Sequence, residues 1–140
     1  QGTAVSEFSI AGLGGVYYPG VFSVDNGGVN DRFGYCVSDS DSDKVSLNVR
    51  VNAIYATPYF SDQGVTPNQT TKASVCVSRS GWAGAIKDTA RVSSGSGKVI
   101  QSMTRLSIGK FDSWANGCIK NFIYYPQPFT NEELQTFTAP

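Results

Sequence analysis

Residues 44–51 alternate strictly between polar and apolar side chains, and this pattern constrains the fold more than any other feature of the sequence. Every odd-numbered residue from Val45 to Val51 is apolar, and every even-numbered residue from Lys44 to Arg50 is polar. Because successive side chains of a β-strand point to opposite faces, the pattern predicts a strand with one face on a core and the other in water. Such half-buried strands are typical of antiparallel sheets.

The same period of two recurs along the chain. Residues 32–38, 74–78 and 104–109 alternate in this way, so we expect Phe33, Tyr35, Val37, Leu106 and Ile108 to face the core. Shorter candidate strands lie at 5–10, 20–24, 53–60, 82–87 and 90–93. Segments rich in Gly, Ser, Asn and Asp predict turns at 25–28, 38–43, 61–64 and 93–97. Eight or more short strands at this spacing predict a two-sheet antiparallel sandwich.

The balance of apolar residues supports an all-β fold. The chain has 14 valines and 7 isoleucines but only 4 leucines, and β-branched side chains favour strands over helices. Its 140 residues are the usual size of one domain, so we expect a single β-sandwich over 1–140. The chain begins at Gln1 rather than methionine, from which we expect a fragment of a longer protein. No apolar run is long enough to predict membrane insertion.

One short helix is predicted at the end of the chain. Thr130 and Glu133 have the spacing of a capping box, in which each side chain bonds the backbone N–H of the other residue. Leu134 and Phe137 follow three residues apart and therefore lie on one helical face. We expect the helix to dock on the sandwich through these two side chains.

The charged residues exclude several functions. Eleven Lys and Arg balance eleven Asp and Glu, so the chain lacks the basic surface of a nucleic-acid-binding protein. It has no histidine, and two of its three glutamates, Glu132 and Glu133, begin the predicted helix. Glycoside hydrolysis needs two carboxylates that flank one bond, and no pattern here supplies them. We therefore expect no enzymatic activity, no catalytic residue and no cofactor.

An acidic loop offers a weak metal hypothesis. Asp39, Asp41 and Asp43 present three carboxylates at alternate positions, and calcium binds oxygen ligands from such loops. The spacing lacks the glycine and the glutamate of an EF-hand loop. A solvated hairpin tip is the alternative, and it is favoured.

The three cysteines indicate reduced thiols. Cys36, Cys76 and Cys118 form no C-x-x-C pair, and an odd number cannot complete a disulfide framework. Three small buried apolar residues are the favoured interpretation. A Cys36–Cys76 bridge is the alternative, because both cysteines begin a Cys-Val-Ser-x-Ser sequence.

Aromatic residues are the best candidates for a binding site. A sugar site combines aromatic rings, which cover the C–H face of a sugar, with polar groups that bond its hydroxyls. We predict Trp82, Trp114 and Tyr59 as platforms for carbohydrate. The predicted hydroxyl partners are Asp62, Asn68 and Asp112. The alternative is that these rings pack in the core, where large aromatics contribute most of the stabilisation.

The last third of the chain resembles a known family. The quoted segments are Thr-Arg-Leu-Ser-Ile-Gly at 104–109, Trp-Ala-Asn-Gly-Cys-Ile-Lys-Asn-Phe at 114–122, Tyr-Tyr-Pro at 124–126 and Asn-Glu-Glu-Leu-Gln at 131–135. Their order is similar to the C-terminal concanavalin A-like (laminin-G-like) domain of bacteriophage tail fibres. Cys118 stands where that family often has a polar residue, and Phe137 replaces its leucine.

The resemblance implies a jelly-roll sandwich and a function. The resemblance places the domain at the end of a fibre but does not identify a ligand; we expect a non-catalytic host-attachment domain that binds bacterial surface polysaccharide at the distal end of the tail fibre in the virion. The resemblance further implies a homotrimer, and it gives Ile119, Tyr124, Tyr125 and Leu134 structural roles. One alternative is a structural cap that folds and trimerises the fibre end without a ligand, and a less favoured one is a capsule-degrading glycanase.

Overall fold

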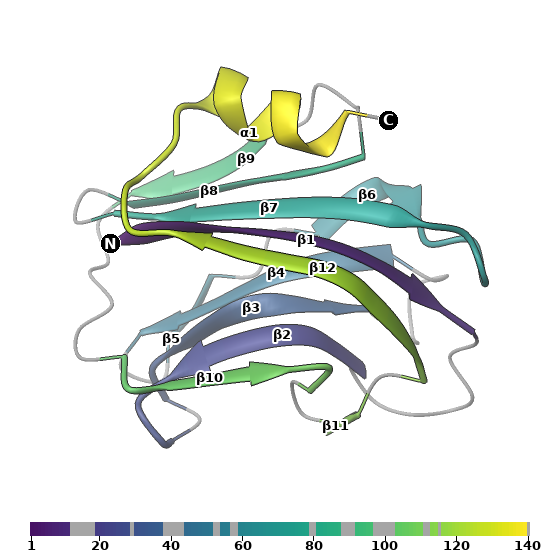
Figure 1. Ribbon diagram of the computed structural model, residues 1–140. Helices are drawn as coiled ribbons and strands as arrows, with labels where there is room; N and C mark the ends of the chain where they lie inside the picture. Colours follow the sequence, from purple (N-terminus) through teal and green to yellow (C-terminus); the bar gives the residue numbers. More distant parts are fainter. Residues whose placement is uncertain are drawn as a thin grey trace.

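The computed structural model describes residues 1–11, 19–28, 30–37, 44–51, 54–56, 59–78, 81–87, 92–96, 103–110, 113–114 and 116–139. These residues form two stacked β-sheets, and a C-terminal helix covers one of them (Figure 1). Neighbouring strands are antiparallel, except that β11 (Ser113–Trp114) pairs with β2 in parallel. The predicted two-sheet antiparallel sandwich with a terminal helix is confirmed.

The five-stranded sheet, called sheet A, joins the two ends of the chain. Its strands in spatial order are β12 (Gly117–Tyr125), β1 (Gly2–Ile10), β7 (Thr71–Val77), β8 (Gly81–Ile86) and β9 (Val92–Ser96). The helix α1 (Asn131–Thr138) lies across β7, β8 and β9 on the outer face of this sheet (Figure 1).

The seven-stranded sheet, called sheet B, is built mainly from the first half of the chain. Its strands in spatial order are β10 (Arg105–Ile108), β2 (Pro19–Asp25), β3 (Arg32–Val37), β4 (Lys44–Val51) and β5 (Ile54–Ala56). In addition, β6 (Tyr59–Gly64) pairs with β4, and β11 pairs with β2. The edge strands β10 and β12 lie on the same side of the sandwich (Figure 1).

The strand at 44–51 is confirmed over its full predicted length as β4. The single strand expected at 53–60 is wrong, because this segment contributes to two strands, β5 and β6. Pro58 lies between them, and proline cannot donate a hydrogen bond to a sheet. The turns expected at 61–64 and 93–97 are also wrong, because residues 61–64 belong to β6 and residues 93–96 to β9.

The core fills the space between the inner faces of the two sheets. Phe33, Tyr35 and Val37 are buried in it, as their alternation predicted. Leu106 and Ile108 are different, because their side chains are 49% and 46% exposed. Their strand β10 is an edge strand of four residues, so the expectation that both are buried in the core is wrong.

A β-bulge sets which side chains of β12 face inward. Glu7 pairs with Asn121 and Phe8 with Ile119, so Lys120 is an extra residue without a partner position on β1. The inward residues of β12 are therefore Ile119, Phe122 and Tyr124, which lie opposite the inward residues of β1. This interrupted period explains why simple alternation did not predict β12.

Tyr35 connects the two sheets through the core. Its side chain is fully buried, and its hydroxyl donates to the backbone carbonyl of Ser74 in β7, with the carbonyl of Ala85 in β8 at 3.3 Å. Burial raises the pKa of the Tyr35 hydroxyl well above its usual value. Tyr35 is therefore held as the neutral donor.

The capping box of α1 is confirmed in both halves. The Thr130 hydroxyl accepts from the Glu133 N–H at 3.2 Å, and the Glu133 carboxylate accepts from the Thr130 N–H at 2.7 Å. Leu134 is fully buried, whereas Phe137 remains 37% exposed and stacks on Phe129. Ser74 also donates to the Leu134 carbonyl at 3.1 Å. No helix in the described part of the chain is long and apolar enough to cross a membrane.

The cysteines are free thiols in different surroundings. Cys36 and Cys76 are buried, but Cys118 is exposed on β12, so the expectation of three buried thiols is wrong for Cys118. Cys36 alternates with core residues of β3 and Cys76 with core residues of β7, so each lies on the outward side of its own sheet. A Cys36–Cys76 bridge is therefore absent.

The buried Tyr35 hydroxyl generates a pH-dependent prediction. Because the pKa of Tyr35 is raised in the folded state, its protonated hydroxyl contributes fully to stability below about pH 10, the pKa of tyrosine in the unfolded chain. This contribution is lost as the pH rises further. We expect the free energy of unfolding to fall above about pH 10 in the wild type and to fall less steeply in Tyr35→Phe. Urea unfolding between pH 8 and pH 11.5 measures this, and parallel curves for the two proteins would contradict it.

The capping box generates a second prediction. Thr130→Ala removes the acceptor for the Glu133 N–H and should lower the free energy of unfolding by about 1 kcal/mol. Thr136→Ala is the matched control, because Thr136 is exposed within the helix and alanine favours helix. Equal losses of stability in the two variants, measured by urea unfolding, would show that the cap has no special role.

Candidate functional site

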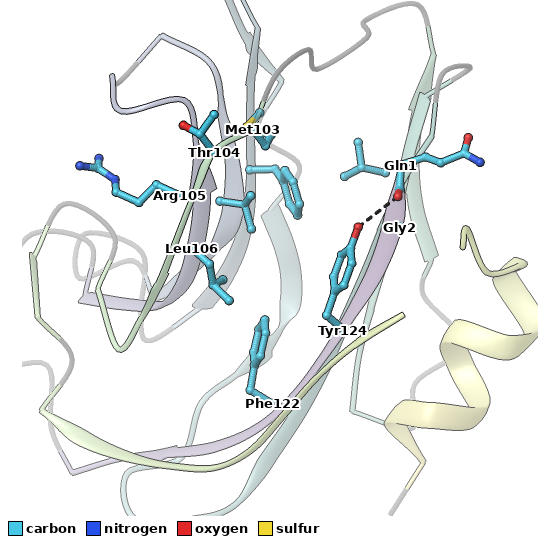
Figure 2. A pocket seen from close by; sticks show the side chains of 11 residues that line it. Gln1, Gly2, Met103, Thr104, Arg105, Leu106, Phe122 and Tyr124 are labelled. Atoms are coloured by element: carbon cyan, nitrogen blue, oxygen red, sulfur yellow. Dashed lines mark hydrogen bonds between the residues drawn. The ribbon is translucent and has the colours of Figure 1, made fainter. Parts of the chain in front are cut away.

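A pocket of about 310 Å³ opens between the edge strands of the two sheets. We call it the lateral pocket, and Figure 2 shows its lining. Sheet A contributes residues of β1, β7 and β12, and sheet B contributes β10 with the residues just before it and parts of β2 and β3. The lining consists of Gln1, Gly2, Val24, Phe33, Val77, Met103, Thr104, Arg105, Leu106, Phe122 and Tyr124.

Tyr124 forms one wall of the lateral pocket. Its side chain is 51% exposed, and its hydroxyl donates to the backbone carbonyl of Gln1 at 3.1 Å (Figure 2). Gly2 makes this position possible, because a Cβ atom there would lie 2.2 Å from the Tyr124 hydroxyl oxygen. The ring is therefore fixed at the mouth of the pocket and open to solvent.

The floor of the lateral pocket is apolar and continuous with the core. Phe33 and Val77 belong to the main core cluster, and Phe122 packs against it. The Phe122 ring meets Phe22 edge to face, with ring centroids 5.1 Å apart. Leu106 faces Phe122 from the opposite sheet (Figure 2). This packing gives the pocket a rigid base.

The polar groups lie at the rim. Thr104 and Arg105 come from the start of β10, and Figure 2 shows the Arg105 side chain directed away from the aromatic rings. The Arg105 Nε atom donates to the Asp25 carboxylate at 2.8 Å. The Asp25 side chain is 6% exposed and that of Arg105 is 56% exposed, so a buried carboxylate anchors a solvent-facing guanidinium.

The chemistry of the lining is that of recognition. None of the described residues that line the lateral pocket carries a carboxyl, thiol or imidazole group. The lining instead combines an apolar floor, one exposed aromatic ring, a hydroxyl and a guanidinium. An arrangement of this kind suits a ligand with an apolar face and a polar rim.

Trp82 lies by a second, more open pocket. This pocket has a volume of about 410 Å³ and lies where the chain enters α1. Its hydroxyls are already engaged, since Ser78 donates to the Gly81 carbonyl at 3.2 Å and Thr130 caps the helix. Trp82 itself is half-buried and packs against the main core, which agrees with the alternative interpretation of the aromatic residues.

The other predicted site residues lie on separate elements. Tyr59 and Asp62 are on β6, next to β4, whereas Trp114 is on β11, next to β2 on the other side of sheet B. The strand positions of these three residues are described, but their side chains are not. Asn68 is exposed in the connection to β7, where its N–H donates to the Ile10 carbonyl at 2.7 Å. The backbone does not gather Tyr59 and Trp114 on one edge.

The remaining predicted residues cannot be assigned a place. Asp112 and the calcium candidates Asp39, Asp41 and Asp43 lie outside the described residues. In the part of the chain that is described, no three His, Cys, Asp or Glu residues form a group that could hold a metal ion. The calcium hypothesis stays a prediction.

Sequence reasoning missed Tyr124 as a site residue and gave it a structural role instead. The signal was present in the pair Tyr124-Tyr125, because adjacent residues of a strand point to opposite faces. Tyr125 packs against Phe129 and Phe137 on the outer face, with ring centroids 4.8 Å and 5.5 Å apart. The other tyrosine of the pair must then face the pocket side.

Sequence comparison identifies no relative, since no protein-family model and no curated protein matches the chain. Comparison of structures does identify similar folds. The CBM40 module of the Ruminococcus gnavus IT-sialidase matches with a TM-score of 0.76 at 12% identity, over 100% of this chain and 83% of that one.

Two further structures have the same architecture. Domain 4 of AbnA, an extracellular arabinanase from Geobacillus stearothermophilus, matches with a TM-score of 0.73 at 13% identity, over 99% of this chain and 66% of that one. A SAP-like pentraxin from Limulus polyphemus matches with a TM-score of 0.68 at 15% identity, over 99% and 69%. Neither of these proteins nor the CBM40 module is a tail fibre. The chain has the concanavalin A-like kind of β-sandwich fold that these domains share.

Proposed function

We propose that this chain is a non-catalytic carbohydrate-binding domain and that the lateral pocket holds a sugar ring. The observation that carries the proposal is the half-exposed Tyr124 ring at the mouth of a preformed pocket. An aromatic face covers the C–H surface of a pyranose, while the Thr104 hydroxyl at the rim bonds one of its hydroxyls. The lining supplies both kinds of contact within one cavity.

The size of the lateral pocket limits the ligand. Its volume of 310 Å³ is near the lower end of the range of about 300–1,000 Å³ for small-molecule sites. One or two sugar rings fit such a cavity, and the rest of a polysaccharide would remain outside it. Binding to each site would therefore be weak, which suits a domain that acts in several copies.

The ligands of similar folds support the proposal. Solved structures show the R. gnavus module bound to α2,3- and α2,6-sialyllactose and domain 4 of AbnA in complex with arabinotriose. These are different sugars held by one architecture. A carbohydrate ligand is thus compatible with the fold, and its identity must depend on the residues of this chain.

The finer proposal is host attachment by a phage fibre. The C-terminal segments that resemble tail-fibre domains support a location at the distal end of the fibre and bacterial surface polysaccharide as the partner. A homotrimer would multiply weak sugar contacts through avidity.

A structural cap is the second candidate. Four of the exposed large apolar side chains in the described part, Leu106, Ile108, Ile123 and Tyr124, lie on the edge strands β10 and β12. Exposed apolar residues on free strand edges favour association with another chain. If these residues are buried between subunits, the domain assembles the fibre end and the pocket is closed.

A paired substitution on β12 tests the proposal. Tyr124→Ser removes the pocket ring, and Ile123→Ser is the matched control, because it removes an exposed apolar side chain from the opposite face of the same strand. We expect Tyr124→Ser to weaken binding to the best polysaccharide from a glycan array by about tenfold and Ile123→Ser to leave it unchanged.

Two outcomes would contradict carbohydrate binding at this pocket. The first is equal affinity of the two variants in calorimetry, with circular dichroism as the check that both are folded. The second is a wild-type protein that forms an oligomer but binds no glycan. Light scattering should then show that Leu106→Asp dissociates this oligomer. That second result would favour the structural cap.

A further inference from the structure

The described side chains on the floor of the lateral pocket are all apolar. They come from both sheets and from the segment before β10, and they are Val24, Phe33, Val77, Met103, Leu106 and Phe122. Phe33 and Val77 are only 7% and 6% exposed, so the surface of the floor is continuous with the core. A ligand group that reaches this floor therefore meets hydrocarbon from two opposite sheets.

The polar groups of the lining do not serve the floor. The Tyr124 hydroxyl donates to the Gln1 carbonyl, and Arg105 donates to Asp25 outside the pocket. Figure 2 shows the Gln1 amide and the Arg105 guanidinium directed away from the pocket. No described residue of the lining has a buried side-chain nitrogen or oxygen without a hydrogen-bond partner. The Thr104 hydroxyl, at the rim, is the polar group of this lining that a ligand can use.

This distribution determines which part of a sugar can enter. A methyl group gains from leaving water for the floor, because its surface is apolar. A hydroxymethyl group would lose its hydrogen bonds to water and find no replacement among the described side chains of the floor, which is unfavourable. Apolar pockets reject a ligand with one additional hydroxyl by up to about a hundredfold on this basis.

We propose that the floor of the lateral pocket binds a methyl substituent of the sugar, so that the domain selects methyl-bearing sugars over their hydroxylated counterparts. This inference rests on the proposed carbohydrate-binding function and names its ligand class. The shared chemistry is a methyl group that projects from a pyranose ring. It is present as the C5 methyl of a 6-deoxyhexose and as the methyl of an N-acetyl group.

The positions of the aromatic rings separate the two parts of such a ligand. Tyr124 stands half-exposed at the mouth, where the sugar ring can stack on it. Phe122 and Leu106 face one another beyond it (Figure 2), where only a substituent of the ring need reach. The sugar hydroxyls then remain at the rim, near Thr104 and water. The apolar floor thus has a use that a fully hydroxylated sugar would leave unsatisfied.

Matched monosaccharides test the inference. L-rhamnose and L-mannose differ only in the 6-hydroxyl, as do L-fucose and L-galactose, and N-acetylglucosamine differs from N-formylglucosamine by one methyl group. We expect the wild type to bind the methyl-bearing member of at least one pair about tenfold more tightly. NMR titration measures the affinities, and saturation-transfer NMR should give its strongest ligand signal at the methyl protons. The pair that shows the preference distinguishes a 6-deoxy sugar from an acetylated one.

Variants then locate the preference in the pocket. Leu106→Gln introduces an amide opposite Phe122 and should reduce the preference to about threefold or less, because the amide can bond a ligand hydroxyl. Ile108→Gln is the matched control, since Ile108 lies on the same strand, is 46% exposed against 49% for Leu106, and does not line the pocket. Met103→Gln repeats the test from the segment before β10 and should have the same effect as Leu106→Gln. Circular dichroism checks that all three variants are folded.

The failure of this inference differs from the failure of the proposed function. Equal affinity of the wild type for both members of every pair would overturn the methyl subsite and leave carbohydrate binding intact. A best array glycan without a methyl substituent would also overturn it, as would equal loss of preference in Leu106→Gln and Ile108→Gln. If neither these monosaccharides nor any glycan on the array binds, both proposals are wrong.

Discussion

The sandwich depends on one buried tyrosine and the serine that it contacts. Tyr35 reaches from sheet B through the core to the carbonyl of Ser74, and the Ser74 hydroxyl bonds the Leu134 carbonyl on the other side of sheet A. One residue therefore connects both sheets and the helix. The lateral pocket opens toward the edge strands β10 and β12, which are not neighbours in one ladder, and Phe33 of β3 and Val77 of β7 form part of its floor. The central connection fixes the spacing of the layers, and their edges leave room for a ligand.

Local patterns predicted the elements whose residues determine their own conformation. The alternation at 44–51 predicted β4 in full, and the Thr130–Glu133 capping box predicted the start of α1. Composition failed at residues 61–64 and 93–96, whose Ser, Asp and Gly residues suggested turns. These residues are strands because β4 and β8 supply their hydrogen bonds, and such pairing overrides weak local preference.

The candidate site was less predictable because it depends on which face a side chain occupies. We predicted aromatic platforms at Trp82, Trp114 and Tyr59, but Trp82 packs against the core while Tyr124 stands at the pocket. The strand that contains Tyr124 has a bulge, so its inward-facing residues do not alternate regularly along the sequence. The contact between Arg105 at the pocket rim and Asp25 is more remote still, since these residues are 80 positions apart in the sequence and become neighbours only through the register of β10 and β2. No window of sequence contains that register.

Because of the bulge in β12, loss of the residue at position 120 would not change which side chains of the strand face inward. Lys120 has no partner position on β1, so its deletion would join Ile119 to Asn121 in regular pairing and keep Phe122 and Tyr124 on the inner face. Loss of a residue between 121 and 124 has the opposite effect, because a shift of one position exchanges the two faces of a strand. The wall of the pocket thus keeps its arrangement when a residue is lost at position 120, but not when one is lost between 121 and 124.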